Sequence, residues 1–371
     1  MTGRSWRDSV SASEELKDRG RRAVLKAAAA AGGTCLLGGS LEVLAGTPGG
    51  GAGAGGGPIN ARMTGDIAPV HDPCIIKEGG TYYVYGTAMP GSPGITLRTS
   101  PDMIHWKLQT PIFSAIPRWA LALVPEARGM WAPDVSRFPG GYRLYYAVST
   151  FGTNRSVIGL ATNVTLDPRS PAYKWEDQGL VLMSHEGDDF NAIDPNHFVD
   201  LEGRNWLVFG SFWTGIKSRR LDPLTGKLLR AQERVFCLAR RPVPTGGPEA
   251  IEGPFMFERR GNYYLFASYD YCCMGARSTY YTAYGRAREV TGPFLGRDGG
   301  AMLCGSGTVI LKADLQEKER WRGPGGCGVF RDGDHDYIVY HAYDAWRHGI
   351  PTLRIAPLKW SGDGWPAADT A

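Results

Sequence analysis

Three acidic residues of this chain lie in similar local contexts, each next to a proline or glycine and close to apolar residues. They are Asp72 in His71-Asp72-Pro73, Asp194 in Asn191-Ala192-Ile193-Asp194-Pro195 and Glu252 in Ile251-Glu252-Gly253-Pro254. Carboxyl groups that share a partly dry site separate in proton affinity, so that one keeps its proton while another stays ionised. Hydrolysis of a glycosidic bond requires such a proton donor and proton acceptor. Acids that only cap turns or strand ends remain the structural alternative.

An internal repeat indicates how these acids are positioned. Five runs rich in Tyr, Phe, Trp and Val each follow a glycine-containing turn, and they start roughly 60 to 75 residues apart, which is long enough for a four-stranded unit. The runs are Tyr82–Thr87, Tyr142–Thr150, Asn205–Ser211, Tyr263–Tyr269 and Tyr337–Tyr343. The pattern predicts an all-β protein and, with five units, a five-bladed β-propeller.

The three acids occupy nearly the same place relative to these runs. Asp72, Asp194 and Glu252 lie 14, 16 and 15 residues before Gly86, Gly210 and Ala267. The second unit has Pro133-Asp134 at the corresponding place, and the fifth has Gly325-Gly326-Cys327. The inner strands of a propeller surround one channel, so equivalent positions on them converge at one end of the axis. We therefore expect the three acids to share one site.

Composition supports this fold and argues against some partners. Aromatic residues make up 11% of the 371 residues, and the chain contains 51 Gly and 25 Pro, a profile typical of a β protein with many turns. The formal charge is only +4, so there is no electrostatic reason to expect nucleic acid or an anionic membrane as a partner. We expect a monomer.

The N-terminal segment has the features of an export signal. Arg21-Arg22 is followed by Leu25-Lys26 and a weakly apolar stretch, which is typical of a twin-arginine signal over residues 1–45. Glu42 and many glycines disfavour a stable membrane span. Residues 46–60 are predicted to be a Gly/Ala-rich linker and residues 61–371 a single catalytic propeller. These features predict a secreted or periplasmic protein.

Seven cysteines are present, and none shows the spacing of a zinc site. An exported chain permits disulfides, but a domain of this size does not need them. We therefore expect the cysteines after Cys35 to remain reduced and buried.

From about Asp66 to Pro366 the chain resembles glycoside hydrolase family 43, and within it the arabinan endo-1,5-α-L-arabinanases. The resemblance depends on the order and spacing of several motifs besides the three acidic ones. They are Trp131-Ala132-Pro133-Asp134, Ser149-Thr150-Phe151-Gly152, Gly210-Ser211-Phe212-Trp213, Cys272-Cys273, Ser278-Thr279-Tyr280 and Tyr340-His341-Ala342-Tyr343-Asp344.

The resemblance implies a five-bladed propeller that cleaves internal α-1,5-L-arabinofuranosidic bonds of arabinan with inversion. In matching positions, Asp72 would be the general base that activates water and Glu252 the general acid. Asp194 would set the pKa of Glu252 and hold it in place.

The resemblance also implies a substrate site. Trp131, Phe151 and Trp213 could stack on sugar rings, although most aromatic residues of such a chain pack between blades. The other residues expected to line the site are Gly152, Asn191, Ala192, Ile193, Ser211 and Phe212.

His341 lies in the last aromatic run, which we expect to be an inner strand. In the arabinanases this histidine lies at a metal ion, usually calcium, in the channel, so the resemblance implies calcium at His341. Calcium prefers oxygen ligands, so most of its shell would be water. One departure from the family is Gly326-Cys327, where a Gly-His pair is common.

Two other interpretations remain open. An exo-arabinanase, an α-L-arabinofuranosidase or a β-xylosidase of the same family would use the same acids. A non-catalytic sugar-binding propeller belongs to a different class, but binding alone does not need an acid, a base and a group that sets a pKa.

Overall fold

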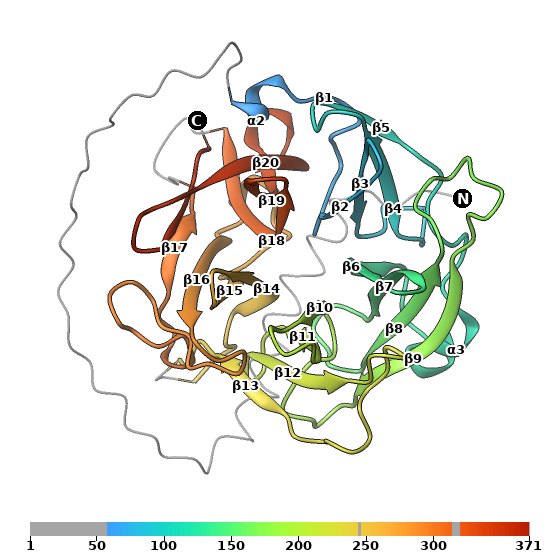
Figure 1. Cartoon of the computed structure of the whole chain (residues 1–371). Helices are drawn as coiled ribbons and strands as arrows, with labels where there is room; N and C mark the ends of the chain where they lie inside the picture. The colour runs from blue at the N-terminus through green and yellow to red at the C-terminus, as the bar shows by residue number, and fades with distance from the viewer. Residues whose placement is uncertain (1–57, 244–245, 314–319, 371) are drawn as a thin grey trace.

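The computed structural model describes residues 58–243, 246–313 and 320–370. Their strands form five sheets placed around a central axis (Figure 1), which makes the protein a five-bladed β-propeller. This confirms the fold predicted from the repeat. The predicted export signal and the predicted linker up to residue 57 lie outside the described residues.

Each blade is built from strands that are consecutive in the chain. Blade 1 contains β2 (Cys74–Glu78), β3 (Thr81–Gly86), β4 (Thr96–Ser100) and β5 (His105–Leu108), with β1 (Thr64–Gly65) parallel to β5. Blade 2 contains β6 (Met130–Phe138), β7 (Gly141–Val148), β8 (Ser156–Asn163) and β9 (Glu176–Ser184). Blade 3 contains β10 (Asn196–Val199), β11 (Asn205–Phe209), β12 (Ile216–Leu221) and β13 (Phe236–Ala239). Blade 4 contains β14 (Ile251–Arg259), β15 (Asn262–Tyr269), β16 (Tyr281–Ala287) and β17 (Thr308–Leu311). Blade 5 contains β18 (Trp321–Asp332), β19 (His335–Asp344), β20 (Ile350–Trp360) and β21 (Pro366–Ala368).

Short helices occupy the connections between strands. The α-helices are α2 (Ile59–Arg62) and α3 (Arg118–Leu123), and the 3₁₀-helices are η1 (Gly275–Arg277), η2 (Met302–Cys304) and η3 (Ala345–Arg347). Within the described ranges, no helix is long and apolar enough to cross a membrane.

The first strand of every blade lies nearest the axis, as Figure 1 shows for β2, β6, β10, β14 and β18. The five aromatic runs form the second strands, which pair antiparallel with these innermost strands. Both faces of a second strand are therefore covered by neighbouring blades, which explains why these strands are apolar on both sides instead of alternating.

Five hydrophobic clusters fill the spaces between neighbouring blades. Tyr83 and Tyr146, for example, belong to the cluster between blades 1 and 2, and Trp206 and Leu265 to the cluster between blades 3 and 4. Most of the aromatic residues thus pack between blades, as the sequence predicts. Burial of these large rings supplies the main stabilising term for the fold.

A buried carboxyl group connects blades 2, 3 and 4 close to the axis. Asp134, only 5% exposed, accepts hydrogen bonds from the backbone N–H of His197 (2.8 Å) and from Asn196 Nδ2 (3.0 Å). Asn196 Oδ1 in turn accepts the backbone N–H of Met256 at 2.8 Å. Burial raises the pKa of Asp134 to about 6, although these hydrogen bonds lower it in part.

Asp134 predicts a pH dependence of stability that a single substitution should remove. Because its folded pKa lies above its unfolded value of 3.8, the folded state binds more protons between about pH 4 and 6, and the Asp134 contribution to stability falls as pH rises through that window. His197 acts in the opposite direction, since burial lowers its pKa from 6.5 to about 4. Relative to the wild type, Asp134→Asn should therefore gain up to about 3 kcal/mol between pH 4 and 7.

Urea unfolding of both proteins at several pH values measures this difference. The loss of one hydrogen-bond acceptor in Asp134→Asn adds an offset that does not depend on pH. A stability difference that stays constant from pH 4 to 7 would contradict the raised pKa of Asp134.

The ring is closed between blades 5 and 1 by side chains and loop hydrogen bonds, and among the described residues no strand is exchanged between these two blades. Val70 N–H donates to the carbonyl oxygen of Pro351 (2.8 Å), and Ile355 N–H donates to Asn60 Oδ1 (2.7 Å). Val84 and Val339 belong to one cluster that spans both blades. We call this contact between blades 5 and 1 the closing seam.

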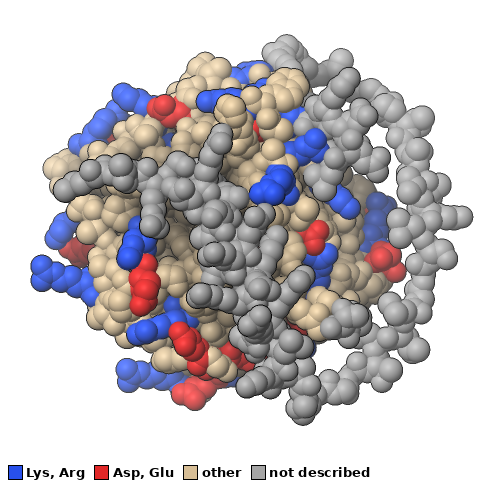
Figure 2. Space-filling model, turned by 180° about the vertical axis from the view of Figure 1, so that it is seen from behind, with Lys and Arg blue, Asp and Glu red and all other residues tan. Residues whose placement is uncertain are grey.

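The surface carries charges of both signs. On the face shown in Figure 2, Lys and Arg side chains alternate with Asp and Glu, and the visible described surface has no extended patch of one sign. This agrees with the small formal charge of the chain.

Candidate active site

The end of the axis at which the innermost strands begin is built from one backbone feature repeated in all five blades. A residue with positive φ occurs there in each blade, and in four of the five blades a proline follows it. These residues are Asp72 (47°), Ala132 (43°), Asp194 (55°), Gly253 (58°) and Gly326 (56°). The left-handed conformation is unfavourable for residues other than glycine, so Asp72, Ala132 and Asp194 are held in it by their surroundings.

The five residues with positive φ show which positions of the blades are structurally equivalent, and they correct in part the equivalence of the three acids expected from the sequence. Asp72 and Asp194 are structurally equivalent, but Glu252 precedes the equivalent residue Gly253 by one position. In blade 2 the equivalent residue is Ala132, whereas Asp134 follows two positions later and serves the contact between blades. The three acids nevertheless belong to one end of the axis, because a single cavity is lined there by Asp72, Asp194 and Gly253 together with residues of blades 2 and 5.

The second strands supply polar side chains that reach this end. The residue six positions after the start of the second strand is Thr87 in blade 1, Ser211 in blade 3, Ser268 in blade 4 and His341 in blade 5. Three of these side chains accept the backbone N–H of the left-handed residue in the next blade. The pairs are Thr87 with Ala132 (2.9 Å), Ser268 with Gly326 (2.9 Å) and His341 with Asp72 (3.2 Å).

The expectation that His341 lies on an inner strand is wrong, because β19 is the second strand of blade 5. His341 still reaches the axis because β18 has register shifts on either side of Gly325, opposite His341. Gly326 is required there: a Cβ atom on it would lie 2.6 Å from Asp72 Oδ1 and 2.9 Å from His341 Nδ1.

Asp72 is kept ionised by its neighbours. Its Oδ2 accepts hydrogen bonds from Thr87 Oγ1 (2.6 Å) and His71 Nδ1 (2.8 Å). Burial raises the pKa of Asp72, but the His71 ring, the nearby His341 and the Thr87 hydroxyl outweigh it and lower the pKa to about 2. Asp72 is therefore a carboxylate at any pH at which the protein would work.

The pKa values of Glu252 and Asp194 are raised, in contrast to that of Asp72. Burial, with the negative charges of Glu252 and Asp72 nearby, raises the pKa of Asp194 well above its usual value. Burial also raises the pKa of Glu252, against hydrogen bonds from Ser211 and Tyr280 and with a further rise caused by Asp72. The pair therefore holds a proton at pH values where exposed carboxyl groups have lost theirs.

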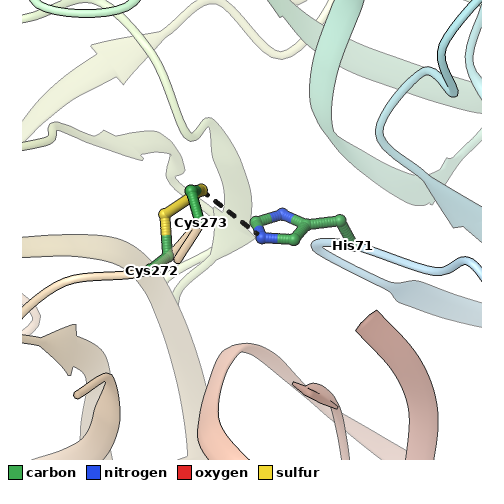
Figure 3. A group of neighbouring side chains, drawn as sticks. All are labelled: His71, Cys272 and Cys273. Carbon is green, nitrogen blue, oxygen red and sulfur yellow. Dashed lines mark hydrogen bonds between the residues drawn. A yellow bond between two sulfur atoms is a disulfide. The ribbon is translucent and has the colours of Figure 1, made fainter. Parts of the chain in front are cut away.

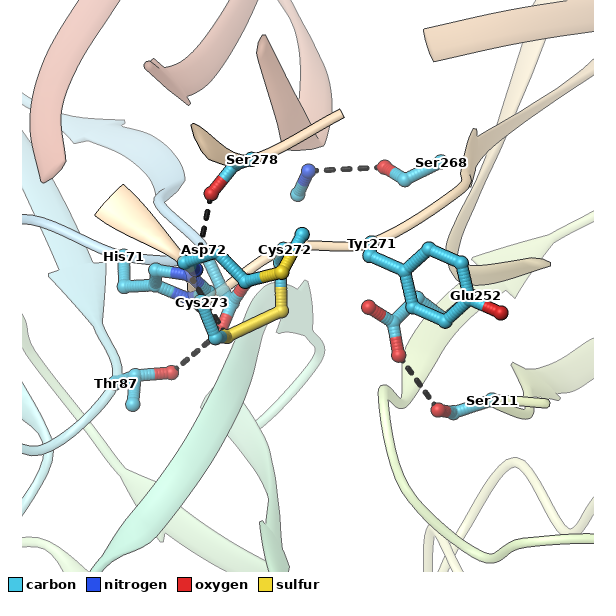
Figure 4. Close-up of a disulfide and its surroundings, with 12 residues drawn as sticks. His71, Asp72, Thr87, Ser211, Glu252, Ser268, Tyr271, Cys272, Cys273 and Ser278 are labelled. Carbon is cyan, nitrogen blue, oxygen red and sulfur yellow. Dashed lines mark hydrogen bonds and ion pairs between the residues drawn. A yellow bond between two sulfur atoms is a disulfide. The ribbon is translucent and has the colours of Figure 1, made fainter. Parts of the chain in front are cut away.

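Hydrogen bonds fix the orientation of this pair. Ser211 Oγ donates to Glu252 Oε2 at 2.6 Å, as Figure 4 shows. Asp194 Oδ2 accepts the backbone N–H of Gly253 at 3.0 Å. Since Gly253 follows Glu252 directly, Asp194 holds the segment that carries Glu252.

The expected substrate residues lie at different depths. Phe151 is 59% exposed and its ring centroid lies 5.2 Å from that of the partly buried Trp131, while Gly152 (φ 78°) forms the exposed turn beside them. Trp131 is the second residue of β6 and lies at the end of the axis that holds the acids. These rings are open to a ligand that enters from that end.

Asn191, Ala192 and Ile193 are buried. Asn191 Oδ1 accepts a hydrogen bond from Ser156 (2.7 Å), Ala192 N–H donates to Ser184 Oγ (2.9 Å), and the Ile193 carbonyl accepts the N–H of Gly210 (3.0 Å). The contacts of these three residues support the segment that presents Asp194.

The segment after β11 combines support with exposed rings. Ser211 is 3% exposed and orients Glu252. Phe212 and Trp213, both partly buried, have consecutive positive φ angles of 56° and 46°. The Phe212 ring lies 5.9 Å from that of Tyr271, so this segment contacts the loop after β15.

The expectation that all later cysteines are reduced and buried is wrong. Cys272 and Cys273 form a disulfide between adjacent residues in the loop after β15 (Figure 3). Cys74 and Cys327 are free and buried, as expected, whereas Cys237 is free and only partly buried. Burial raises the pKa of Cys327 to about 12, so this side chain is a neutral thiol.

Four site residues were not predicted from the sequence as functional: His71, Thr87, Tyr280 and Tyr343. His71 and Tyr280 stand in motifs quoted for the resemblance, but only contacts reveal their roles. Thr87 could have been found, because it aligns with Ser211 and Ser268 at the end of the repeated aromatic run. Tyr343 also stands in one of these motifs, Tyr340–Asp344, but tyrosines occur in four of the five aromatic runs, so the sequence does not single it out.

Two groups of side chains in the described part of the chain have the spacing to hold a metal ion: His71 with Asp72 and His341, and His71 with Cys272 and Cys273. The disulfide removes the thiolates of the second group. In the first group His341 is fully buried and its Nε2 has no hydrogen-bond partner. An orphaned buried ring nitrogen fits a position that is completed by a bound group or by water.

A ring of five blades with an ionised carboxyl group and a protonated carboxyl pair at one end of its axis defines a propeller that can perform general acid–base hydrolysis. Comparison with known proteins agrees with this class. The family model for glycosyl hydrolases family 43 matches residues 67–366. The chain therefore belongs to glycosyl hydrolases family 43.

The similar proteins include an enzyme of each mode of action. The extracellular endo-α-(1→5)-L-arabinanase 1 of Bacillus subtilis (strain 168) is 40% identical over 299 residues, 80% of this chain and 87% of that protein. The extracellular exo-α-(1→5)-L-arabinofuranosidase ArbA of Cellvibrio japonicus (strain Ueda107) is 39% identical over 307 residues, 81% and 86% of the two chains. The solved structure of Cellvibrio cellulosa α-L-arabinanase with arabinohexaose has a TM-score of 0.76 at 38% identity, covering 82% of this chain and 96% of that one.

Proposed function

We propose that the protein hydrolyses internal α-1,5-L-arabinofuranosidic bonds of arabinan with inversion of configuration. The observation that carries the proposal is the split in proton affinity at one end of the axis: Asp72 is ionised, while the Asp194–Glu252 pair holds a proton. Endo- and exo-acting arabinan hydrolases among the similar proteins support the substrate class.

In the proposed reaction Asp72 accepts a proton from the water that attacks the anomeric carbon. Glu252 donates its proton to the glycosidic oxygen as the bond to the leaving sugar breaks. Ser211 and Tyr280 both hydrogen-bond the Glu252 side chain and so hold it in one orientation. Asp194 fixes the backbone at Gly253, and the negative charge of Glu252 nearby raises the pKa of Asp194, so that the two carboxyl groups share one proton.

We place Trp131, Phe151, Gly152, Phe212 and Trp213 in contact with the sugar chain. Asn191, Ala192, Ile193 and Ser211 belong to the same site as supports of the two acids. The proposed partner is an arabinan chain, and the proposed assembly is a monomer.

Product analysis on debranched linear arabinan tests both the activity and its mode. Internal cleavage produces a mixture of oligosaccharides from the first minutes, whereas exo action produces arabinose or one fixed oligomer from the start. Proton NMR of the first product shows its anomeric configuration and tests inversion. Tight binding of arabinan without any turnover would overturn the proposal in favour of a sugar-binding propeller.

We also propose one hydrated calcium ion on the axis, at His341 Nε2. The residues fit such an ion on one condition. His341 Nδ1 accepts the Asp72 backbone N–H, and in that tautomer the ring proton is on Nε2. Direct binding of calcium by Nε2 requires the other tautomer, with the proton on Nδ1, which lies 3.9 Å from Asp72 Oδ1. Calcium prefers six to eight oxygen ligands, so water must fill most of the shell. When bound, the ion would supply positive charge at the axis.

Elemental analysis and thermal unfolding test this ion independently of activity. We expect one calcium per chain after dialysis and a fall of about 5 °C or more in the unfolding midpoint on chelation, the size expected when a ligand bound well above its Kd is removed. His341→Ala should lose both the ion and the effect of chelation. Ser268→Ala, at the equivalent position of blade 4, serves as control and should keep both. Calcium bound at full occupancy by His341→Ala would contradict the assignment.

The paired arginines Arg21-Arg22 and the apolar stretch after them support the further proposal that the protein is exported by a twin-arginine signal. Two similar proteins are named extracellular. Replacement of Arg21-Arg22 by Lys-Lys should retain the protein inside the producing cell, which fractionation would measure.

A further inference from the structure

The disulfide Cys272–Cys273 lies beside the proposed general base. Figure 4 shows it next to His71 and Asp72, on the loop between β15 and β16. In Figure 3 the sulfur of Cys273 faces the His71 ring, and Sγ lies 3.8 Å from Nε2. The mechanism proposed above gives this disulfide no task.

A continuous series of hydrogen bonds connects the disulfide loop to Asp72. The backbone N–H of Cys273 donates to Tyr343 Oη at 2.8 Å, and Tyr343 Oη lies 2.8 Å from His71 Nε2. His71 Nδ1 lies 2.8 Å from Asp72 Oδ2.

The directions of these bonds are determined by the group at the end. Asp72 is ionised and can only accept, so His71 Nδ1 carries a proton, and in the neutral form of the ring Nε2 then accepts. Tyr343 therefore donates its hydroxyl proton to His71, and its oxygen is free to accept from Cys273. Every donor in the series has one acceptor, and the last acceptor is the proposed base.

The backbone at Cys273 is in a conformation that the loop alone would not favour. Its φ is 67°, and the left-handed conformation is unfavourable for a residue other than glycine. A bond between neighbouring sulfur atoms closes a small ring that restricts both residues. Ser278 fixes the next residue, since its Oγ accepts the backbone N–H of Met274 at 3.1 Å.

We infer that the Cys272–Cys273 disulfide is a positioning element for Asp72: it holds the Cys273 N–H on Tyr343, and so holds His71 and the base. The inference rests on the proposed function. The enzyme is accordingly most active in its oxidised form. An external dithiol supplies the two electrons and two protons that convert the disulfide into two thiols, and the dithiol itself becomes a disulfide.

We expect loss of the disulfide to act mainly on the orientation of Asp72, since the hydrogen bonds from Cys273 lead to that residue. Small displacements of a reacting group reduce rate by roughly 10- to 100-fold. After reduction, or in Cys272→Ser, we expect kcat on linear arabinan to fall by about 10-fold or more. The KM should change less than kcat, because Trp131 and Phe151 lie on blade 2, away from the disulfide loop, and only Phe212 contacts that loop, through Tyr271.

The test compares kcat and KM of the oxidised protein, the protein reduced with dithiothreitol, and the same sample reoxidised. Recovery of kcat on reoxidation is expected. Cys304→Ser, a change in the same blade outside this loop, controls for reduction elsewhere and should keep the kcat of the wild type. Urea unfolding of each form shows whether a fall in kcat reflects partial unfolding.

Tyr343→Phe separates positioning from general support of the loop. This variant lacks the hydroxyl that links Cys273 to His71, so reduction should lower its kcat by no more than about 2-fold relative to the oxidised variant. The effects of the substitution and of reduction on kcat would then be strongly non-additive. A full further loss on reduction of Tyr343→Phe would overturn the inference. An unchanged kcat in reduced wild type would overturn it as well, and that measurement needs no substitution. If the oxidised wild type has no activity on arabinan, the proposed function fails instead.

Discussion

Glu252→Gln is expected to lose about 10³-fold in kcat on linear arabinan, within the range found for removal of a general acid. The substitution keeps the shape of the side chain, and the amide oxygen can still accept the Ser211 hydroxyl, which donates to Glu252 at 2.6 Å in the wild type. What it removes is the proton that the leaving oxygen needs. Steady-state release of reducing ends measures the loss.

The nature of the leaving group tests the reason for that loss. A nitrophenyl group leaves without protonation. On a nitrophenyl α-1,5-arabino-oligosaccharide the kcat of Glu252→Gln should therefore fall only about 10-fold, because general acid catalysis accounts for most of the loss on arabinan. Equal losses on both substrates would mean that Glu252 is not the acid. Glu258→Gln is a matched control further along the same strand β14 and should behave as the wild type.

Asp72→Asn is expected to lose about 10³- to 10⁴-fold in kcat on both substrates, the upper part of the range for general base catalysis. The base acts on the attacking water, so a better leaving group gives no relief. The asparagine oxygen can still accept from Thr87 and His71, which both lie within 2.8 Å of Asp72 Oδ2, so the fold of the site should persist.

Azide distinguishes a missing base from a damaged site. This anion attacks without first losing a proton, so it should restore part of the activity of Asp72→Asn and yield an arabinosyl azide detectable by mass spectrometry. It should not accelerate the wild type. If Asp72→Asn retains more than about a tenth of the kcat of the wild type, well outside the usual range, Asp72 is not the base.

The repeat was readable from the sequence because each blade places its aromatic run after a hairpin turn at the same offset. This was enough to predict five blades and to bring Asp72, Asp194 and Glu252 to one end of the axis. The prediction that the aromatic run of His341 is an innermost strand was wrong. A run that is apolar on both faces is expected where neighbouring blades cover both of its faces. That position is the second strand.

Other features depend on contacts that no spacing encodes. The His71–Tyr343 hydrogen bond joins residues 272 positions apart, and a tyrosine in an aromatic run gives no sign of it. The disulfide Cys272–Cys273 was not predicted, because the expectation of reduced cysteines considered only whether a domain of this size needs disulfides for stability. This bond restricts a single loop instead. The burial of Asn191 and Ala192 follows from how the chain enters β10, which the motif alone does not show.

The closing seam gives the site a mechanical weakness. Asp72 comes from blade 1, whereas His341 and Tyr343 come from blade 5, so the hydrogen bonds that orient the base cross the one junction at which the chain's first and last blades meet. In the part of the chain that the structure describes, no strand is shared by these two blades, so they can separate without breaking a β-ladder. We therefore expect heat to abolish catalysis through a local opening of this junction, at a temperature below that of global unfolding.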